Sequence, residues 1–379
     1  MFRLHSIFSH RYALLTVLLA LLALVACREK YVQEPAFIHE PRAETGTPRS
    51  YLLGFSALPS TLSNSAFIQA LDLTAQYGDL LLIQRTPSWN EFVPDVVPSE
   101  QLHQLALREH EAVEARGLTL FYAIDPFDPS NRGRLAGLPP KYMQADLSNP
   151  DLFAAFVEEA RFIATNYQPR YLALGIEVNA TFEHDPHQYT AYLQAYRAAY
   201  EAVKEISPET ITFATFQYEQ LLGLVPWEPA RPPRWELIQD FAGHLDLIAI
   251  STFPSITYDV ARKVPPLYYS QIADHTTLPI AFAAVGFSSA PGKGDLNSST
   301  PAEQRRYLQR LLADADEIDT HFLIWFAGRD PNFTIATSFN LLASSGLRDT
   351  NDRPKEAWIT WEKASARPYV PFSDYPDVQ

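Results

Sequence analysis

Residues 79–86 read DLLLIQRT, a short apolar run that ends in polar residues and is followed by a longer, mixed segment. The same rhythm recurs along the chain, and each apolar run is nearly continuous rather than alternating. Such runs are expected of parallel strands that are buried on both faces. Eight strands are predicted in this way, at residues 51–58, 79–86, 118–125, 171–178, 210–217, 246–253, 279–286 and 321–328.

Helices are predicted between the strands because several intervening segments begin with recognisable caps. Asn149 and Asp185 each precede a proline, which is favoured in the first turn of a helix. Ser99 is expected to cap another helix, and TPAE at 300–303 has the pattern of a capping box. Eight strands that alternate with helices predict an α/β fold, a (β/α)8 TIM barrel. An open doubly wound sheet is the alternative, but no glycine-rich phosphate turn follows the first strand.

The start of the chain has the composition of a secretory signal. Arg3 and Arg11 precede the apolar run YALLTVLLALLALVA at 12–26, which is shorter than the ~20 residues that span a bilayer. The run ends in LVAC, which resembles the lipobox of bacterial lipoproteins, and this resemblance implies that Cys27 carries lipid. A plain signal peptide or anchor helix with an incidental cysteine is the alternative.

These features divide the chain and place it in the cell. We expect a lipoprotein attached by lipid to the cell membrane on its extracytoplasmic face. The predicted parts are a signal peptide at 1–26, the lipidated cysteine and a flexible tether at 27–50, the barrel at 51–365 and a C-terminal tail at 366–379.

Composition argues against several other kinds of partner. The formal net charge of −14 disfavours binding to nucleic acid, which needs a basic surface. A single cysteine excludes a disulfide framework and a multi-cysteine metal site. His184 and His187 flank a helix start but have no third ligand at a motif spacing, so no metal site is predicted. No cofactor is predicted, and a monomer is expected.

Polar and aromatic side chains follow the predicted strands, where the active face of such a barrel lies. Aromatic rings can stack on the C–H faces of sugars, and carboxylates and amides can bind the hydroxyls. Few cations converge there, so a phosphate site is disfavoured. The predicted substrate-binding residues are Trp89, Asn179, Tyr218 and Trp325. Trp325 could equally pack in the upper core, and Trp358 and Trp361 on the last helix are expected to be core.

Glu177 is the most informative of the polar residues. It ends the apolar run LALGIE, and an isolated buried carboxylate there would be costly. Here the sequence resembles the retaining glycoside hydrolases with (β/α)8 barrels, most nearly the endo-β-1,4-galactanases. The resemblance rests on GIE at 175–177, DLIAISTFP at 246–254 and GLRDTNDRPKEAWITW at 346–361. It implies that Glu177 is a general acid/base, although Ile176 replaces the asparagine of the family.

The same resemblance implies that the second catalytic carboxylate is missing. The nucleophile of the family lies in a strand-7 pattern that matches PIAFAAVGF at 279–287, and its position falls on Ala284. A slip of one residue offers Ala283 or Val285, and no acidic residue lies between Asp274 and Asp295.

Three hypotheses follow. The first is a carbohydrate-binding barrel with a degenerate catalytic pair, whose partner is an oligo- or polysaccharide. The second is an active glycoside hydrolase with Glu177 as the acid and a relocated base, either Glu219 or Asp125. Asp128, Glu91 and Asp330 are further carboxylates to consider. The third is a non-catalytic surface scaffold, which an apolar patch on the outer helices would favour.

Overall fold

The computed structural model describes residues 42–292, 297–318, 320–333 and 341–371. The predicted signal peptide and Cys27 lie outside the described residues. The described residues belong to one compact unit of the chain.

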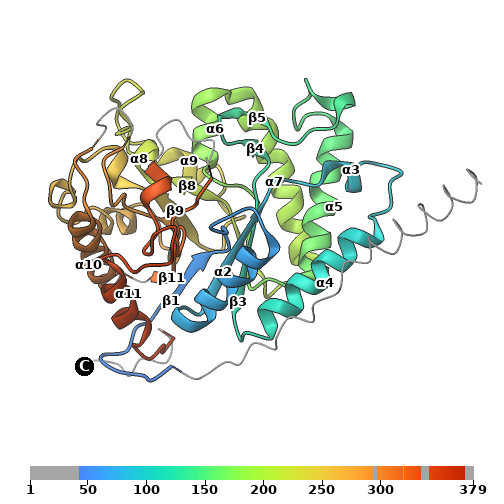
Figure 1. The fold of residues 1–379 in the computed structure, drawn as a ribbon. Helices are drawn as coiled ribbons and strands as arrows, with labels where there is room; N and C mark the ends of the chain where they lie inside the picture. The colour runs from blue at the N-terminus through green and yellow to red at the C-terminus, as the bar shows by residue number, and fades with distance from the viewer. Residues whose placement is uncertain (1–41, 293–296, 319, 334–340, 372–379) are drawn as a thin grey trace, which may run out of the picture. The chain divides into compact units, whose positions relative to one another are not determined.

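All eight predicted strand regions contain a strand, and the strands run parallel to one another (Figure 1). The fifth region holds two short segments, separated only by Ala214. In chain order the barrel strands are β1 (Leu52–Ser56), β2 (Leu80–Arg85), β3 (Thr119–Ile124), β6 (Tyr171–Ala173), β7 (Ile211–Phe213), β8 (Thr215–Gln217), β9 (Ile248–Thr252), β10 (Ile280–Val285) and β11 (Thr320–Trp325).

The sheet closes on itself at the fifth strand. Its order is β7-β6-β3-β2-β1-β11-β10-β9-β8, so the two ends of the list are the two segments on either side of Ala214. β7 pairs with β6, and β8 pairs with β9. The prediction of a (β/α)8 TIM barrel is therefore confirmed, and the open doubly wound alternative is wrong because no edge strand remains.

Helices surround the strands, as Figure 1 shows. Ser99, Asn149, Asp185 and Thr300 each accept a hydrogen bond from a backbone N–H in the first turn of a helix, as predicted. The capping box at 300–303 is only half formed, because the Glu303 carboxylate accepts from the N–H of Ala261 instead. The helices are α2 (Asn64–Tyr77), α3 (Trp89–Phe92), α4 (Glu100–Glu114), α5 (Pro150–Asn166), α6 (Val178–His184), α7 (Pro186–Ile206), α8 (Tyr218–Leu221), α9 (Glu236–Gln239), α10 (Pro301–Glu317) and α11 (Trp358–Ser365).

Aromatic rings fill the inside of the barrel. The ring of Phe322 on β11 contacts those of Phe121, Tyr171 and Phe213, with centroids 5.3, 4.6 and 6.1 Å away. Four bulky rings from four strands leave the interior packed, so a ligand can enter only at an end of the barrel.

Aromatic side chains are also buried where the outer helices pack on the barrel. Trp361 of α11 is fully buried, with its ring 4.6 Å from that of Phe55, and Trp358 lies 4.7 Å from Tyr77. Both tryptophans were expected to be core, and the structure places them there.

Residues that precede and follow the predicted barrel in the sequence are part of the folded unit. Arg49, in the segment predicted to be tether, is 1% exposed and forms an ion pair of 2.7 Å with Asp79. Its backbone is bonded to Pro368 and Val370 of the predicted tail. The folded unit therefore includes residues 42–50 as well as the described part of the tail.

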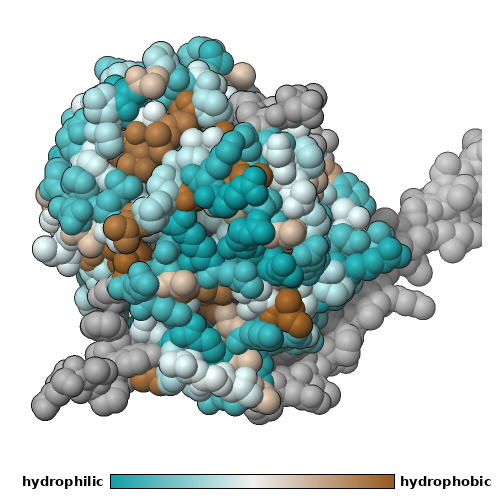
Figure 2. All heavy atoms as spheres, turned by 90° about the vertical axis from the view of Figure 1, so that its left-hand side faces the viewer, coloured by the Kyte–Doolittle hydropathy of each residue, from teal (hydrophilic) through white to brown (hydrophobic). Residues whose placement is uncertain are grey.

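One face of the surface is shown in Figure 2, where apolar side chains form small groups among hydrophilic ones. Among the described residues, none of the helices has the length and apolar character needed to cross a bilayer.

Candidate functional site

Glu177 lies in the turn that joins β6 to α6. The fourth strand was predicted to run to residue 178, but it ends at Ala173. Glu177 has φ 50° and ψ 44°, in the left-handed region, so it cannot continue a strand. A residue other than glycine in this region costs about 1–3 kcal/mol and persists where its surroundings hold it, often at functional sites.

The turn that carries Glu177 is held by its neighbours. The backbone N–H of Glu177 donates to Oγ1 of Thr215 on β8 at 2.9 Å. Tyr192 of α7 donates its hydroxyl proton to the carbonyl of Leu174 at 3.0 Å. Gly175 is required at this contact, because a Cβ there would lie 2.1 Å from the Tyr192 hydroxyl oxygen. The strain at Glu177 is thus supported from two directions.

The carboxyl group of Glu177 is bonded to the next wall of the barrel. Ser251 on β9 donates its hydroxyl proton to Oε1 of Glu177 at 2.6 Å. Burial raises the pKa of Glu177 above its ordinary value, and the negative charge of Asp125 adds to the rise. The positive charge of Arg132 and the Ser251 hydrogen bond act in the opposite sense. The net rise in pKa extends the pH range in which Glu177 keeps its proton.

Asp125 follows β3 and belongs to the same cluster. Its carboxylate accepts a hydrogen bond of 2.9 Å from Arg132 and one of 3.3 Å from Gln84. Asp125 is 6% exposed and Arg132 is 7% exposed. Glu177, Asp125 and Arg132 therefore form one charged group near the carboxyl ends of the third and fourth strands.

Ala284 faces the same space from β10. The register of β10 against β9 shifts between Phe282 and Ala284, and after this shift Ala284 pairs with Ser251. Paired residues on neighbouring strands turn their side chains to the same face. Ala284 is half-buried, whereas the alanines at 281 and 283 are buried. The seventh-strand side chain that lies beside Ser251, the serine that bonds to Glu177, is thus a methyl group.

Apolar surface is available next to Ala284. The half-buried rings of Phe253 and Phe326 meet edge to face with centroids 5.9 Å apart. Gly286 lies against Phe253, since a Cβ there would be 3.0 Å from the ring. Such partly open aromatic edges beside polar groups suit the mixed surface of a sugar.

Glu219 lies on the other side of β9. It is fully buried and accepts hydrogen bonds from Thr252 at 2.6 Å, the Phe253 N–H at 3.1 Å and Tyr268 at 3.2 Å. Thr252 also bonds to Tyr269, which bonds in turn to Tyr307 of the outer helix α10. Because neighbouring residues of a strand point to opposite faces, Ser251 points into the barrel and Thr252 points away from it.

Consequently, the structure separates two of the predicted catalytic residues. Glu177 lies inside the barrel mouth and Glu219 lies in the layer between the strands and the helices. Burial raises the pKa of Glu219, and the hydrogen bonds that it accepts lower it. Every carboxylate oxygen of Glu219 already has a partner, which is the arrangement of a structural group.

The four predicted substrate-binding side chains are also buried. Trp89 and Trp325 are 1% and 0% exposed, and their indole N–H groups donate to the carbonyls of Ala136 and Ser345. The Tyr218 hydroxyl donates to the carbonyl of Tyr268 at 2.5 Å. The side-chain amide of Asn179 accepts a hydrogen bond from the N–H of Gln217 at 2.8 Å and donates one to its C=O at 3.0 Å. None of these side chains presents an open face in this structure.

The remaining carboxylates considered from the sequence have local partners. Glu91 accepts from the N–H and hydroxyl of Ser99, and Asp128 accepts from Ser130. Asp330 forms an ion pair with Lys355, with Nζ 2.6 Å from Oδ2.

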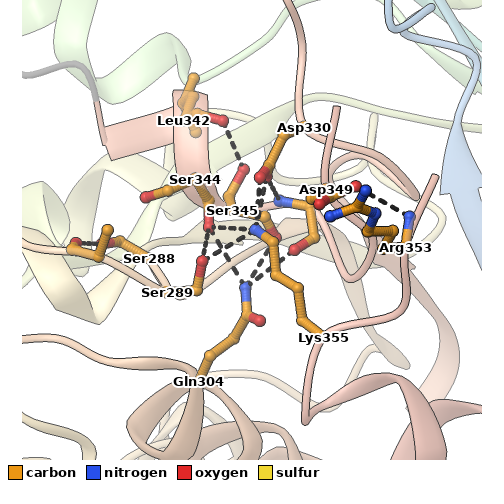
Figure 3. Close-up of polar contacts among 12 residues, drawn as sticks. Ser288, Ser289, Gln304, Asp330, Leu342, Ser344, Ser345, Asp349, Arg353 and Lys355 are labelled. Atoms are coloured by element: carbon orange, nitrogen blue, oxygen red, sulfur yellow. Dashed lines mark hydrogen bonds and ion pairs between the residues drawn. The ribbon is translucent and has the colours of Figure 1, made fainter. Parts of the chain in front are cut away.

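The Lys355 ion pair is the centre of a polar cluster shown in Figure 3. Lys355 also donates to the Ser289 hydroxyl at 2.8 Å, and Asp330 accepts from the N–H of Gly346. Gln304 of α10 donates to the carbonyl of Phe287 at 2.9 Å. These contacts tie the chain after β10 to the chain after β11, and so fix the wall of the mouth that carries Ala284.

The histidines near α6 do not converge with other metal-binding groups. The Nδ1 atom of His184 lies 2.8 Å from the carbonyl of Ala180, and His187 lies 3.3 Å from Asp146. Within the described ranges, no three histidine, cysteine, aspartate or glutamate side chains come together as a metal site would need.

Arg132 and Thr215 are parts of the cluster that sequence reasoning did not single out. Arg132 lies on a short antiparallel hairpin, β4 (Phe127–Asp128) and β5 (Asn131–Leu135), inserted after β3. The turn residues DPSN at 128–131 signal a hairpin, but nothing in them says that Arg132 folds back onto Asp125.

Comparison with known proteins supports the fold. The sequence matches no protein-family model and no curated protein. Solved structures with similar folds include the exo-β-1,4-mannosidase Op5Man5 from Opitutaceae bacterium strain TAV5, at 15% identity and a TM-score of 0.63. That match covers 87% of this chain but only 62% of the other, so this chain spans less than two thirds of that protein.

Two shorter proteins give comparable matches. GH5_18 from Bifidobacterium longum subsp. longum has 15% identity and a TM-score of 0.62, over 85% of this chain and 81% of the other. A GH5_18 variant from Streptomyces cattleya in complex with Manb1-4GlcNAc has 15% identity and a TM-score of 0.61, over 83% and 79%. These similarities show that this chain shares the (β/α)8 barrel fold of those proteins. None of these three names is an endo-galactanase, and the finer resemblance to that branch stays a prediction.

Proposed function

We propose that this chain is a carbohydrate-binding barrel whose mouth, centred on Glu177, holds an oligo- or polysaccharide without cutting it. The observation that carries the proposal is the position of Ala284, in register with the serine that bonds to Glu177. Retention needs two carboxyl groups ~5–5.5 Å apart, and inversion needs two at ~6.5–9.5 Å with water between them. A methyl group at 284 can neither attack a sugar nor activate water.

The kind of sugar is suggested by the names of the structural neighbours. A mannosidase and a complex with Manb1-4GlcNAc make β-linked mannosides the first ligands to test. The sequence resemblance to endo-galactanases adds β-linked galactans. In our proposal the ligand contacts Glu177 and the rings of Phe253 and Phe326, rather than the four buried side chains predicted from the sequence.

Hydrolysis with a relocated base is the second candidate, and one observation favours it. Asp125 follows β3 and Glu177 follows the neighbouring parallel strand β6, so these two carboxyl groups share the mouth. Against it, Asp125 is 6% exposed and is already bonded to Arg132 and Gln84. Glu219 is a poorer base, because it lies behind β9, is fully buried and has a hydrogen-bond donor on each carboxylate oxygen.

A scaffold for protein contacts is the third candidate. It would be favoured by an apolar patch on the outer helices, but the exposed large apolar residues of the described helices are Leu107, Ile206 and Ile359, one each on α4, α7 and α11. Single exposed apolar residues are ordinary at a protein surface.

We also propose that lipid on Cys27 holds the barrel at the extracytoplasmic face of a membrane. The proposal rests on the lipobox-like LVAC and the charged, apolar segment before it. Metabolic labelling with a fatty-acid analogue in a bacterial host tests it: label should enter the wild-type chain and be lost from Cys27→Ser.

The main proposal is tested by calorimetry. The full-length chain in detergent is titrated with a panel of β-mannan, β-galactan, β-glucan and β-xylan oligosaccharides. At least one ligand should bind, and Phe253→Ala should weaken its affinity about fivefold, because an aromatic contact contributes about 1 kcal/mol. Leu107→Ala, on an outer helix, serves as the matched control and should leave binding unchanged. If no sugar binds, the carbohydrate proposal fails.

A further inference from the structure

The β4–β5 hairpin brings a buried arginine to the mouth of the barrel. Its turn is closed by Asp128, which accepts from the N–H of Ser130 at 2.7 Å. Gly133 packs closely on the end of α6, since a Cβ there would lie 3.1 Å from His184 and 3.2 Å from Asp185. The hairpin therefore rests on the helix that Glu177 precedes (Figure 1).

Arg132 is fixed at one end of its guanidinium group. Nη1 donates to Asp125 at 2.9 Å, and the group lies 5.5 Å from the centre of the Phe127 ring. The other two nitrogens, Nε and Nη2, are buried and find no acceptor in the part of the chain that the structure describes. Asp125 follows β3 and Glu177 follows the neighbouring parallel strand β6, so a buried arginine bonded to Asp125 acts on the charge of both carboxyl groups.

We propose that Arg132 is a positioning residue, which neutralises Asp125 and thereby sets the protonation state in which Glu177 meets a ligand. The charged and titratable groups that face it are Asp125 after β3, Glu177 before α6 and Tyr192 on α7. Burial keeps the pKa of Tyr192 well above its ordinary value, so Tyr192 stays neutral. The balance thus involves one arginine and two carboxyl groups.

Removing Arg132 would leave two carboxyl groups without a cation between them. Like charges disfavour ionisation, so Glu177 would hold its proton to a higher pH. Removing Asp125 as well would take away the repulsion that Arg132 no longer offsets. The double variant therefore distinguishes charge balance from packing. If Arg132 acted only by packing, removing the Asp125 contact as well would not restore the titration midpoint of Glu177.

The test is the titration of Glu177 in the full-length chain, followed by 13C NMR of glutamate labelled at the side-chain carboxyl. The Glu177 signal is identified by its loss in Glu177→Gln. We expect Arg132→Gln to raise the titration midpoint by at least one pH unit, and Asp125→Asn to lower it. The double variant Arg132→Gln/Asp125→Asn should return it toward the wild-type value. Arg132→Lys, which keeps the charge, should shift it by less than Arg132→Gln.

An unchanged midpoint in folded Arg132→Gln, or a double variant that keeps the single variant's shift, would overturn the inference. If Arg132→Gln does not fold, Asp125→Asn alone decides: a midpoint that fails to fall contradicts the proposal. The inference rests on the proposed function only for its ligand. The titration needs no sugar, so a shifted midpoint in a protein that binds no sugar would reject the proposed function and retain the role of Arg132.

Discussion

The hydroxyl of Ser251 donates a hydrogen bond of 2.6 Å to Oε1 of Glu177, across the gap between the sixth and fourth strands of the barrel. Ala284 is the in-register neighbour of that serine on the seventh strand. Together the three residues define a mouth with one partly open carboxyl group, a hydroxyl and a methyl group. This chemistry suits holding a polar ligand better than breaking a glycosidic bond.

Ser251 is expected to matter for binding through Glu177. Ser251→Ala removes a hydrogen bond that favours the charged form, so the pKa of Glu177 should rise further and the carboxyl should be less well oriented. We expect the affinity for the bound sugar to fall about tenfold at neutral pH, which corresponds to roughly 1.4 kcal/mol. Calorimetry at several pH values would show this, and an affinity equal to wild type at every pH would contradict it.

A carboxylate restored on the seventh strand should create activity. Ala284→Glu places a second carboxyl group beside Ser251, the residue that bonds to Glu177, and retaining hydrolysis requires two carboxyl groups ~5–5.5 Å apart. We expect release of the aryl group from an aryl β-glycoside at least tenfold above the wild-type rate. Ala284→Gln has nearly the same shape but cannot attack, so it should stay at the wild-type level. Activity of Ala284→Glu that survives Glu177→Gln would show that the two groups do not act together.

Glu177 and Glu219 should differ sharply in their effect on stability. Glu219→Ala would leave the donors from Thr252, Phe253 and Tyr268 without an acceptor in a buried site, which we expect to cost about 3 kcal/mol or more. Glu177→Ala keeps the left-handed backbone and removes a partly exposed side chain with one hydrogen bond, so the free energy of unfolding should change by less than about 1 kcal/mol. Chemical denaturation of both variants provides the comparison. Equal losses would mean that Glu177 is structural too.

A buried carboxyl group in the helix layer should make stability depend on pH. Glu159 of α5 is 5% exposed, both of its oxygens accept from the N–H of Ser88, and burial raises its pKa to about 8. An unfolded glutamate ionises near pH ~4.3, so between that pH and about 8 the folded state binds more protons than the unfolded state. The free energy of unfolding should therefore fall as the pH rises through this window.

Glu159→Gln should remove this part of the pH dependence. The difference in the free energy of unfolding between the variant and wild type should change by on the order of 4 kcal/mol between pH 5 and pH 8. The change should favour the variant at high pH. Glu177 and Glu219 also have raised pKa values and titrate in both proteins, so they cancel in the difference. Parallel pH profiles for the two proteins would contradict the role given to Glu159.

The barrel could be predicted from the sequence because its signals are local. Runs such as DLLLIQRT and the caps at Asn149 and Asp185 report strands and helix starts directly, and the closure of the sheet follows from eight repeats of one unit. The end of the fourth strand was missed, because the apolar residues after Ala173 continue the pattern while the backbone turns at Gly175 to Glu177. That turn depends on contacts with Tyr192 and Thr215, which are distant in the sequence.

The site was harder to predict, since polar residues after a strand do not reveal which way they point. Glu219, Tyr218 and Trp325 follow or end strands as a site residue would, but each is bonded within the layer between strands and helices. Glu177 and Asp125 carry the same kind of signal and do face the mouth. Ser251 points into the mouth and bonds to Glu177, whereas Thr252 points toward the helices and bonds to Glu219. The sequence alone does not show which of these two neighbouring residues faces the mouth.

The central claim is that the mouth binds sugar and does not cut it, and product analysis tests this most directly. Wild-type full-length chain at high concentration would be incubated for a long period with Manb1-4GlcNAc and with every sugar that it binds in the calorimetric panel, and the products would be compared with an enzyme-free sample. The account predicts that the ligand is bound and recovered intact. Release of a shorter sugar that disappears in Glu177→Gln would contradict it, and Asp125→Asn would then show whether Asp125 supplies the second carboxylate.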